Sequence, residues 1–287
     1  MNTAPSLIVL GTAQDGGHPQ AGCQRPCCAR AWEDRALGHL VTSLGLVDPA
    51  ANAGWLLDAS PDLPEQLHRL QRLHPGVSLA GVLLTHAHMG HYTGLLHLGR
   101  EAMGAQGVPV WAMPRMRGFL AENGPWELMV RLGNVQIRPL EDQQPVALSP
   151  RLSVTPFAVP HRDEYSEAVG FIARGPSRSA LYLPDIDKWH RWSTPIEAAL
   201  AEVDLAFVDG TFYGADELPG RAMGEVPHPF ISETLARLAP LPASERAKVH
   251  FIHLNHTNPA LDPDSEAAAA IARAGLSVAV EGAIFAL

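Results

Sequence analysis

The sequence predicts an α/β fold in which apolar strands form sheet layers whose outer faces are covered by helices. Strand-length apolar runs alternate along the chain with segments of helical spacing, which is typical of layered α/β folds. The chain has 287 residues, of which 46% are hydrophobic, so it can bury a large core and disorder is not expected. It contains no internal repeat or low-complexity tract. We therefore expect residues 1–287 to form a single domain.

Strands are expected where a short apolar run is bounded by polar or turn-forming residues. Ser6–Ala13 is the first such run, and it breaks into a Gly-rich loop. Trp55–Asp58 resembles a buried strand that ends in an acid, and Leu79–Thr85 is a continuous apolar run followed by a His-rich loop. The further expected strands are Val108–Ala112, Val135–Arg138, Leu152–Val159, Val169–Arg174, Ala180–Leu183, Val203–Val208, Val249–Leu254, Ser277–Val280 and Ala283–Leu287.

Helices are expected between these runs. Leu63–Leu73 has leucines at helical spacing, and Thr93–Met103 is predicted to be a helix directly after the His-rich loop. Pro195–Ala201 and Ile231–Leu238 have helical patterns, and Pro263–Ala274 is an Ala-rich helix. This interleaving of strands and helices underlies the predicted fold class.

Charge and the N-terminal sequence restrict the class of protein. The formal net charge is -9 and the pI is near 5.8, with the acidic excess spread along the chain, so nucleic acid is not indicated as a partner. No apolar stretch approaches the roughly 20 residues that span a bilayer. The N-terminus lacks a basic region and a long apolar run, so we do not expect a signal peptide. We expect a cytoplasmic protein with a small-molecule substrate; the oligomeric state, with a homodimer as one option, stays open.

Histidines are concentrated directly after the apolar run Leu79–Thr85. His86, His88 and His91 lie within six positions in the segment THAHMGHYTGL. On an extended segment His86 and His88 point to the same side, and His91 follows near the start of the expected helix. Converging neutral imidazoles bind zinc, iron or manganese, so this segment predicts a metal site.

This segment resembles the H-x-H-x-D-H signature of the metallo-β-lactamase superfamily. The resemblance spans nearly the whole chain and implies a four-layer αββα sandwich. It also implies an active site with one or two ions of zinc, manganese or iron. Residues that match the superfamily's other site residues follow in the same order along the chain. Asp58 matches the acid that holds the metal-binding loop, and His161 matches the next ligand. Asp185 matches the carboxylate that bridges two metals, and His253 matches the last ligand.

The chain departs from this signature at Gly90, where the superfamily has an Asp that binds the second metal. His91, Asp185 and His253 remain for that metal, without one anionic ligand, and the ion should bind more weakly. Either the second site is weak or empty, or another acid replaces the missing one. Asp187 and Asp209 are the candidates suggested by sequence context.

The cysteines Cys23, Cys27 and Cys28 form a tight, odd-numbered cluster, which favours metal binding over a disulfide framework. Similar clusters occur in the phosphonate-pathway cyclic phosphodiesterases and in the pyrroloquinoline-quinone biosynthesis protein B family. In those relatives a C-terminal histidine completes a structural zinc site, and His256 matches it here. The spacing differs, because Arg25 stands where a Cys would be and two cysteines are adjacent. Both can bind one zinc ion only if the chain turns there.

Other segments resemble the pyrroloquinoline-quinone biosynthesis protein B group, notably GTAQDGGHPQ near the N-terminus and HLNHTNP at 253–259. Typical members of that group have lost the first two histidines of the signature, whereas this chain keeps His86 and His88. The chain therefore resembles a relative that retains a hydrolase-type metal centre. Phosphodiesterase branches carry an extra histidine between the bridging Asp and the last ligand, and His228 matches it.

These residues predict a metal-dependent hydrolase of a phosphodiester or related ester. The metal lowers the pKa of a bound water towards about 7 and so supplies hydroxide, while His228 protonates the leaving group as general acid. One alternative is an iron-dependent oxidative enzyme of pyrroloquinoline-quinone assembly. Another, suggested by the missing Asp, is a catalytically weak binding or carrier protein. Metal content, oxygen consumption and hydrolysis screens separate the three.

Overall fold

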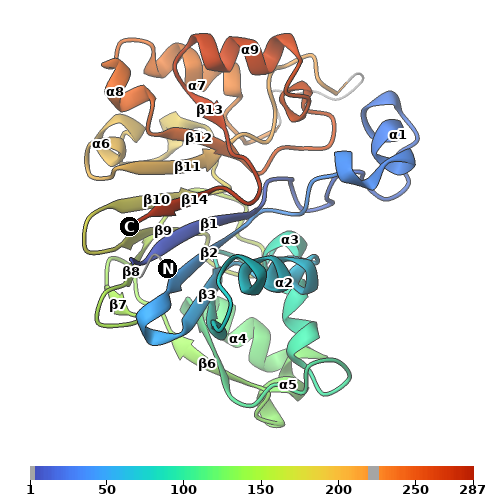
Figure 1. Cartoon of the computed structure of the whole chain (residues 1–287), viewed down its shortest axis with the longest axis vertical. Coiled ribbons are helices and arrows are strands. Elements are labelled where there is room, and N and C mark those ends of the chain that lie inside the picture. The colour runs from blue at the N-terminus through green and yellow to red at the C-terminus, as the bar shows by residue number, and fades with distance from the viewer. Residues whose placement is uncertain (1–3, 219–225) are drawn as a thin grey trace.

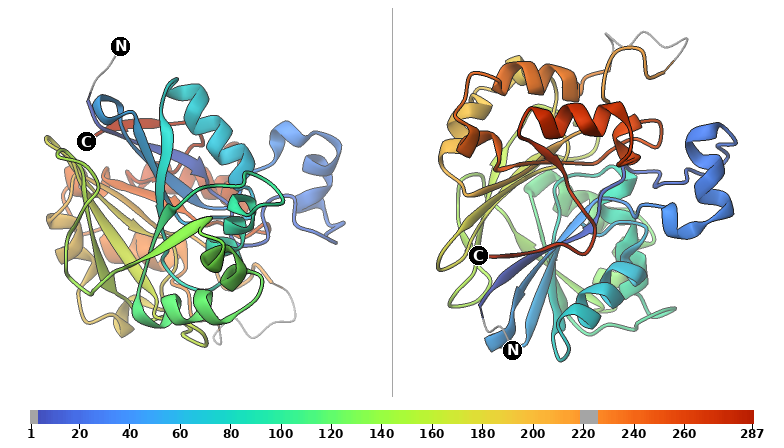
Figure 2. Two further views of the ribbon diagram at one scale, coloured as in Figure 1. Left: turned by 90° about the horizontal axis from the view of Figure 1, so that it is seen from below. Right: turned by 45° about the horizontal axis from the view of Figure 1, so that its top comes forward.

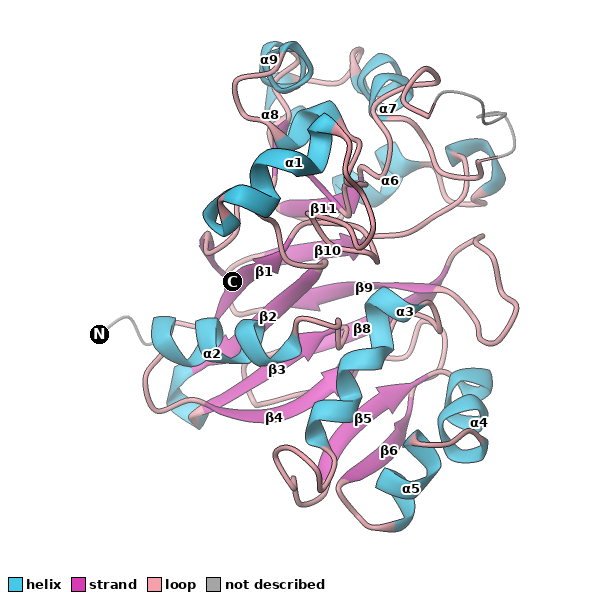
Figure 3. Ribbon diagram, turned by 90° about the vertical axis from the view of Figure 1, so that its right-hand side faces the viewer, coloured by secondary structure: helices cyan, strands magenta, loops and turns pink. Residues whose placement is uncertain are grey.

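The described part of the chain folds into two seven-stranded sheets that lie face to face, with helices on their outer faces (Figures 1 and 3). This computed structural model describes residues 4–218 and 226–287. The predicted αββα sandwich is confirmed by this arrangement. Among the described residues, no helix combines the length and apolar character that crossing a bilayer requires.

Each sheet has one continuous strand order. The first sheet runs β14 (Ile284–Ala286), β1 (Ser6–Gly11), β2 (Ser43–Asp48), β3 (Ala53–Leu57), β4 (Ser78–Leu83), β5 (Val108–Ala112) and β6 (Val135–Pro139). The second sheet runs β13 (Ser277–Val278), β12 (Val249–Ile252), β11 (Leu205–Asp209), β10 (Ser179–Leu183), β9 (Val169–Arg174), β8 (Ser153–Ala158) and β7 (Val146–Ala147).

The strand directions bring the chemically important loops to one edge of the sandwich. In the first sheet β3 and β4 are parallel, and β1 has the same direction because β2 is antiparallel to both β1 and β3. In the second sheet β10, β11 and β12 are parallel, and β8 shares their direction across the antiparallel β9. The loops that follow these strands therefore emerge at their carboxyl ends, where ligands bind in open α/β sheets.

Side chains alternate between an inner and an outer core. In β1, Leu7 and Val9 face the core between the sheets, whereas Ile8 and Leu10 belong to the cluster under the helices of the first sheet. This alternation follows from the two-residue period of a strand. The inner core packs the two sheets against each other, and the two outer cores pack the helices on the sheets.

The helices divide between the two outer faces and one side of the molecule. Those on the first sheet are α2 (Leu63–Leu73), α3 (Met89–Tyr92), α4 (Pro114–Glu122) and α5 (Trp126–Arg131). Those on the second are α6 (Ile196–Ala201), α7 (Ile231–Leu238), α8 (Ala243–Arg246) and α9 (Glu266–Arg273). Helix α1 (Pro26–Glu33) stands out at the side in both views of Figure 2. Short 3₁₀ helices are η1 (Arg35–Leu37), η2 (Pro49–Ala51), η3 (Thr93–Leu98), η4 (Trp189–Arg191) and η6 (Pro259–Leu261).

One expected helix differs in type and extent. The segment predicted as a helix over Thr93–Met103 is the 3₁₀ helix η3, which ends at Leu98. Gly94 lies so close to the loop after β3 that a Cβ there would be 1.9 Å from the Ser60 carbonyl oxygen. Glycine also weakens an α-helix by about 1 kcal/mol relative to alanine. The close approach of Gly94 to Ser60 thus accompanies the tighter winding of a 3₁₀ helix in this segment.

Candidate metal centre

Three histidines and one aspartate converge where the loops after β4, β8 and β10 meet. His86 Nε2 lies 2.8 Å from His88 Nδ1, which lies 3.4 Å from His161 Nε2. Asp185 completes the group, with Oδ2 3.3 Å from His86 Nε2 and Oδ1 3.2 Å from His161 Nε2. The four donor atoms all lie within 4.8 Å of one another. We call His86, His88 and His161 the triad site.

A second group of donors lies beside the triad site. His91 Nε2 and His253 Nε2 are 3.3 Å apart. Asp15, from the loop after β1, places Oδ1 3.4 Å from His91 Nε2 and 3.9 Å from His253 Nε2. We call Asp15, His91 and His253 the second site. His91 and His253 are fully buried, so these imidazoles do not face bulk water.

Asp185 lies between the two sites. Its Oδ2 is 3.9 Å from His91 Nε2 and 3.8 Å from His253 Nε2, in addition to its approach to His86. The side chain is almost fully buried, so its carboxylate does not face bulk water. A carboxylate in this position could serve both sites, and the bridging role of Asp185 stays a prediction.

The spacing of the donors fits metal ions. Two nitrogens that each lie about 2.0–2.1 Å from one tetrahedral zinc ion are about 3.3 Å apart. The 3.4 Å between His88 and His161 and the 3.3 Å between His91 and His253 match this separation, whereas the 2.8 Å between His86 and His88 is shorter. Imidazole lone pairs that face each other at these distances repel unless a proton or a cation lies between them. The residues present therefore fit one ion in the triad site and one in the second site.

The electrostatics of the region also favour cations. Burial would raise the pKa of Asp185, but the His161, His253 and His228 imidazoles hold it well below its usual range. Burial would lower the pKa of His161, but Asp185 and Asp187 raise it to about 10. The carboxylates thus stabilise positive charge among the imidazoles, and a metal ion supplies positive charge in the same place.

Asp58 fixes the loop that carries these histidines. It accepts a hydrogen bond from the Thr85 backbone N–H at 2.8 Å, and its Oδ2 lies 2.7 Å from His91 Nδ1 and 3.1 Å from the Tyr182 hydroxyl. The bond to Nδ1 leaves Nε2 of His91 directed toward His253, which is how outer carboxylates orient metal-binding histidines. Asp58 and His253 adopt positive φ values of 69° and 66°, a backbone conformation that is uncommon for residues other than glycine.

His228 lies at the edge of the centre and is paired with Asp209. Its Nδ1 is 2.8 Å from Asp209 Oδ2 and 3.2 Å from Asp185 Oδ1, and Thr211 Oγ1 approaches the same nitrogen at 3.3 Å. Burial would lower the pKa of His228, but Asp209 and Asp185 raise it. The pairing holds Nδ1 and leaves Nε2 as the ring nitrogen that can exchange a proton.

The structure differs from the sequence prediction on the replacement for the missing Asp. Asp209 lies against His228, and Asp187 Oδ1 lies 3.4 Å from His161 Nδ1, outside the second site. Asp15 occupies that position, and sequence reasoning did not identify it. The available signal was its place after β1, because β1 ends at the same sheet edge as β3.

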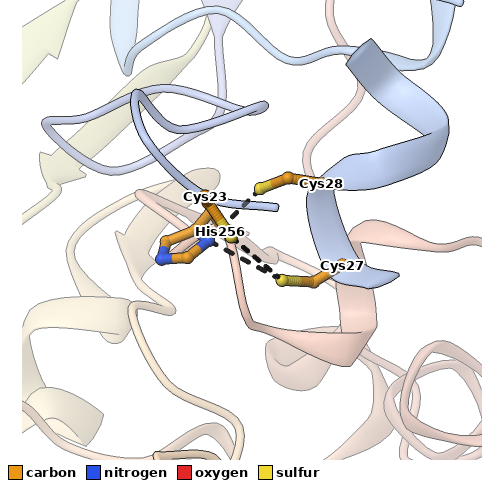
Figure 4. A group of neighbouring side chains, drawn as sticks. All are labelled: Cys23, Cys27, Cys28 and His256. Atoms are coloured by element: carbon orange, nitrogen blue, oxygen red, sulfur yellow. Dashed lines mark hydrogen bonds between the residues drawn. The ribbon is translucent and has the colours of Figure 1, made fainter. Parts of the chain in front are cut away.

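The cysteine cluster and His256 form a separate group of donors (Figure 4). Cys23 Sγ and Cys27 Sγ are 3.8 Å apart, and Cys28 Sγ lies 3.3 Å from His256 Nδ1. Two sulfurs that each lie about 2.3 Å from a tetrahedral zinc ion are about 3.8 Å apart, so this set fits zinc. Helix α1 begins at Pro26, and its first turn provides the bend that lets adjacent cysteines face one point.

Comparison with known proteins places this geometry in context. Residues 55–280 match the model of the β-lactamase superfamily domain. The chain is 31% identical to coenzyme PQQ synthesis protein B of Methylobacterium sp. (strain 4-46), over 96% of this chain and 97% of that protein. It is 32% identical to the protein of the same name from Xanthomonas oryzae pv. oryzae, over 98% of this chain and 99% of that one.

Solved structures share the fold over almost the whole chain. Zn²⁺-bound PqqB from Methylobacterium extorquens superposes with a TM-score of 0.82 and 25% identity, over 98% of this chain and 100% of that one. A diphosphatase of the PhnP family superposes with a TM-score of 0.66 and 21% identity, over 98% and 96% of the two chains. The second likeness supports the fold alone.

Proposed function

The chain belongs to the β-lactamase superfamily and, within it, to the family of coenzyme PQQ synthesis protein B, and from this premise we propose that it is a metal-dependent hydrolase. The proposed substrate is a phosphodiester or a related ester. The proposal goes beyond the family assignment, because it rests on the histidine and aspartate side chains of the triad site and the second site.

The observation that supports hydrolysis is the set of two adjacent donor groups with Asp185 between them. Metal ions bound there would polarise the scissile ester and lower the pKa of a water molecule, which makes it nucleophilic at neutral pH. The chain contributes the arrangement: Asp58 orients His91, and the buried Asp185 keeps the two sites adjacent.

His228 is proposed as the general acid. The Asp209 carboxylate fixes the ring through Nδ1, so that a proton on Nε2 is available to the oxygen atom that leaves the ester. Asp209 acts through this ring and is a positioning residue, and its second oxygen accepts a hydrogen bond from Thr211 Oγ1 at 2.7 Å. The pair thus resembles the base-and-orienter arrangement of other hydrolases.

The types of ligand atom at each site restrict which metals can bind there, but they do not select a single metal. Imidazole and carboxylate ligands suit zinc, manganese and iron, so we propose one of these for each of the two sites. Three thiolates and an imidazole suit zinc, which we propose as a structural ion at Cys23, Cys27, Cys28 and His256.

A second candidate function is an iron-dependent oxidative step in PQQ assembly. The identities of 31% and 32% to proteins named for PQQ synthesis, over nearly full length, favour it. The discriminating assay measures oxygen consumption with a tyrosine-like substrate by the iron-loaded protein. Turnover that requires oxygen would favour the oxidative candidate, whereas turnover under anaerobic conditions would favour hydrolysis.

The direct test of hydrolysis uses protein loaded with Mn²⁺ or Zn²⁺ under anaerobic conditions and bis(p-nitrophenyl) phosphate as substrate. We expect release of p-nitrophenolate that depends on the metal and that disappears in His86→Ala. Absence of turnover with this diester and with a panel of carboxylic esters, together with tight binding of a small molecule, would replace the hydrolase with a binding protein.

His228→Gln is expected to slow hydrolysis in a way that depends on the leaving group. General acids contribute about 10²–10⁴-fold, so we expect losses in this range for a diester with an alkyl leaving group, which needs a proton. For p-nitrophenolate, which leaves without one, the loss should be less than about tenfold. The measurement is kcat for both diesters, with His250→Gln as a control outside the donor groups. Equal losses for both substrates would contradict the assignment.

A further inference from the structure

We propose that Asp15 is the acidic ligand of the second site, and that residue 90 is glycine because Asp15 occupies the space that a side chain there would need. The inference rests on the proposed metal centre. It assigns to a loop near the N-terminus the role that the superfamily signature gives to its own aspartate.

The first step is the place of the Asp15 carboxylate. Its Oδ1 lies 3.4 Å from His91 Nε2 and 3.9 Å from His253 Nε2, within the donor group of the second site. With Asp185 beside it, this gives the second ion two imidazoles and two carboxylates. The anionic ligand that Gly90 cannot supply is therefore present, and it comes from a position 75 residues earlier in the chain.

The second step concerns the space around Gly90. A Cβ on this glycine would lie 2.2 Å from Asp15 Oδ1 and 2.7 Å from Asp15 Cα, closer than such atoms can approach. Gly90 is not among the glycines with positive φ, so the backbone does not require glycine for its conformation. Lack of space is thus the reason for glycine, and Asp15 is what fills the space.

The third step is that Asp15 is held in place from several sides. The Gly90 backbone N–H donates to Oδ1 at 3.2 Å, and the Gln14 side-chain amide donates to Oδ2 at 2.9 Å. The Gln14 backbone N–H donates to the Leu254 carbonyl at 2.8 Å, which joins the Asp15 loop to the residue after His253. Two ligands of the second site are therefore adjacent through the backbone before any ion binds.

A structural role for Asp15 and a ligand role predict different results for Asp15→Asn. The amide oxygen of asparagine can still accept from the Gly90 backbone N–H, and its NH2 group can donate to the Gln14 side-chain oxygen once the Gln14 amide is flipped, so a purely structural role would survive the change. The negative charge, which neutralises a divalent ion, is lost. Metal affinity thus separates the two roles, and it can be measured without any assay of activity.

The experiment is a titration with Mn²⁺, which prefers nitrogen and oxygen donors and so reports on the triad and second sites rather than on the cysteine cluster. The wild-type protein is expected to bind two Mn²⁺ ions and to give the electron paramagnetic resonance signal of a coupled pair. Asp15→Asn is expected to bind the second ion at least about tenfold more weakly and to lose the coupled signal. Asp34→Asn, an exposed aspartate that caps η1, is the matched control.

Gly90→Ala tests whether residue 90 is glycine because Asp15 fills the space next to it. It should displace Asp15 and weaken the second ion, and it should add little in an Asp15→Asn background, because both changes remove the same ligand. If wild-type protein binds no Mn²⁺, the proposed metal centre itself fails. If wild type and Asp15→Asn both bind two ions equally well, the centre stands and the assignment of Asp15 is overturned. If Gly90→Ala does not fold, the isosteric Asp15→Asn still tests whether Asp15 binds the second ion.

Discussion

Cys28→Ser is expected to remove the zinc ion that we propose at the cysteine cluster and to lower the melting temperature by about 10 °C. Cys28 is fully buried, and its Sγ lies 3.3 Å from His256 Nδ1, on a segment 228 residues away. A cross-link over so long a stretch of chain contributes on the order of 5 kcal/mol, and each kcal/mol corresponds to about 2 °C in a domain of this size.

The same change should weaken the second site but spare the triad site. Asp15 lies on the segment that leads to the three cysteines, and His253 is followed closely by His256. A zinc ion at the cluster would therefore join the two segments that carry these second-site ligands. His86 and His161 lie on other loops, so the triad site should keep its affinity in the variant.

The measurements are zinc content by mass spectrometry, thermal unfolding, and the Mn²⁺ titration described above. Ala31→Ser is the matched control, because it places the same hydroxyl in another buried position of α1 and removes no donor. Unchanged zinc content and melting temperature in Cys28→Ser would show that the cysteines are buried thiols without a structural ion.

Asp185→Asn is expected to affect both active-site ions at once. Its carboxylate approaches His86 and His161 on one side and His91 and His253 on the other. Loss of a residue that only orients a ligand costs about 10–100-fold in affinity, so loss of a shared ligand should cost at least about 100-fold at each site. Hydrolysis should fall below detection at metal concentrations that saturate the wild-type protein.

Asp48→Asn is the matched control for this prediction. Asp48 is also buried and carries the same charge, but it pairs with Arg151 and caps η2, outside both sites. We expect this variant to retain two ions. A result in which Asp185→Asn loses only one ion would mean that the carboxylate serves a single site and does not bridge.

Those parts of the site that depend on local sequence could be predicted. His86 and His88 follow a buried strand in an extended segment, and His161 and Asp185 each follow another strand. The apolar runs predicted that each of these residues follows a strand, and the resemblance to the superfamily signature implied that they meet in one site. The signature residues and the apolar runs carry this information directly.

Other parts depend on contacts between distant segments, which one sequence does not reveal. Asp15 belongs to the second site only because the loop after β1 pairs with Leu254 and packs on Gly90. Strand β2 was not predicted, since Ser43, Gly45 and Asp48 interrupt its apolar pattern and its burial comes from β1 and β3 on both sides. Tertiary contacts, rather than local preference, decide such elements.

The most direct test of a two-ion centre around Asp185 is anomalous X-ray diffraction from crystals grown with Zn²⁺ and measured at the zinc absorption edge. Two peaks are predicted on either side of the Asp185 carboxylate, one within bonding distance of His86, His88 and His161 and the other of Asp15, His91 and His253. A further peak is predicted among Cys23, Cys27, Cys28 and His256. Crystals of zinc-saturated protein with no peak next to Asp185 would contradict the metal centre and the hydrolase built on it.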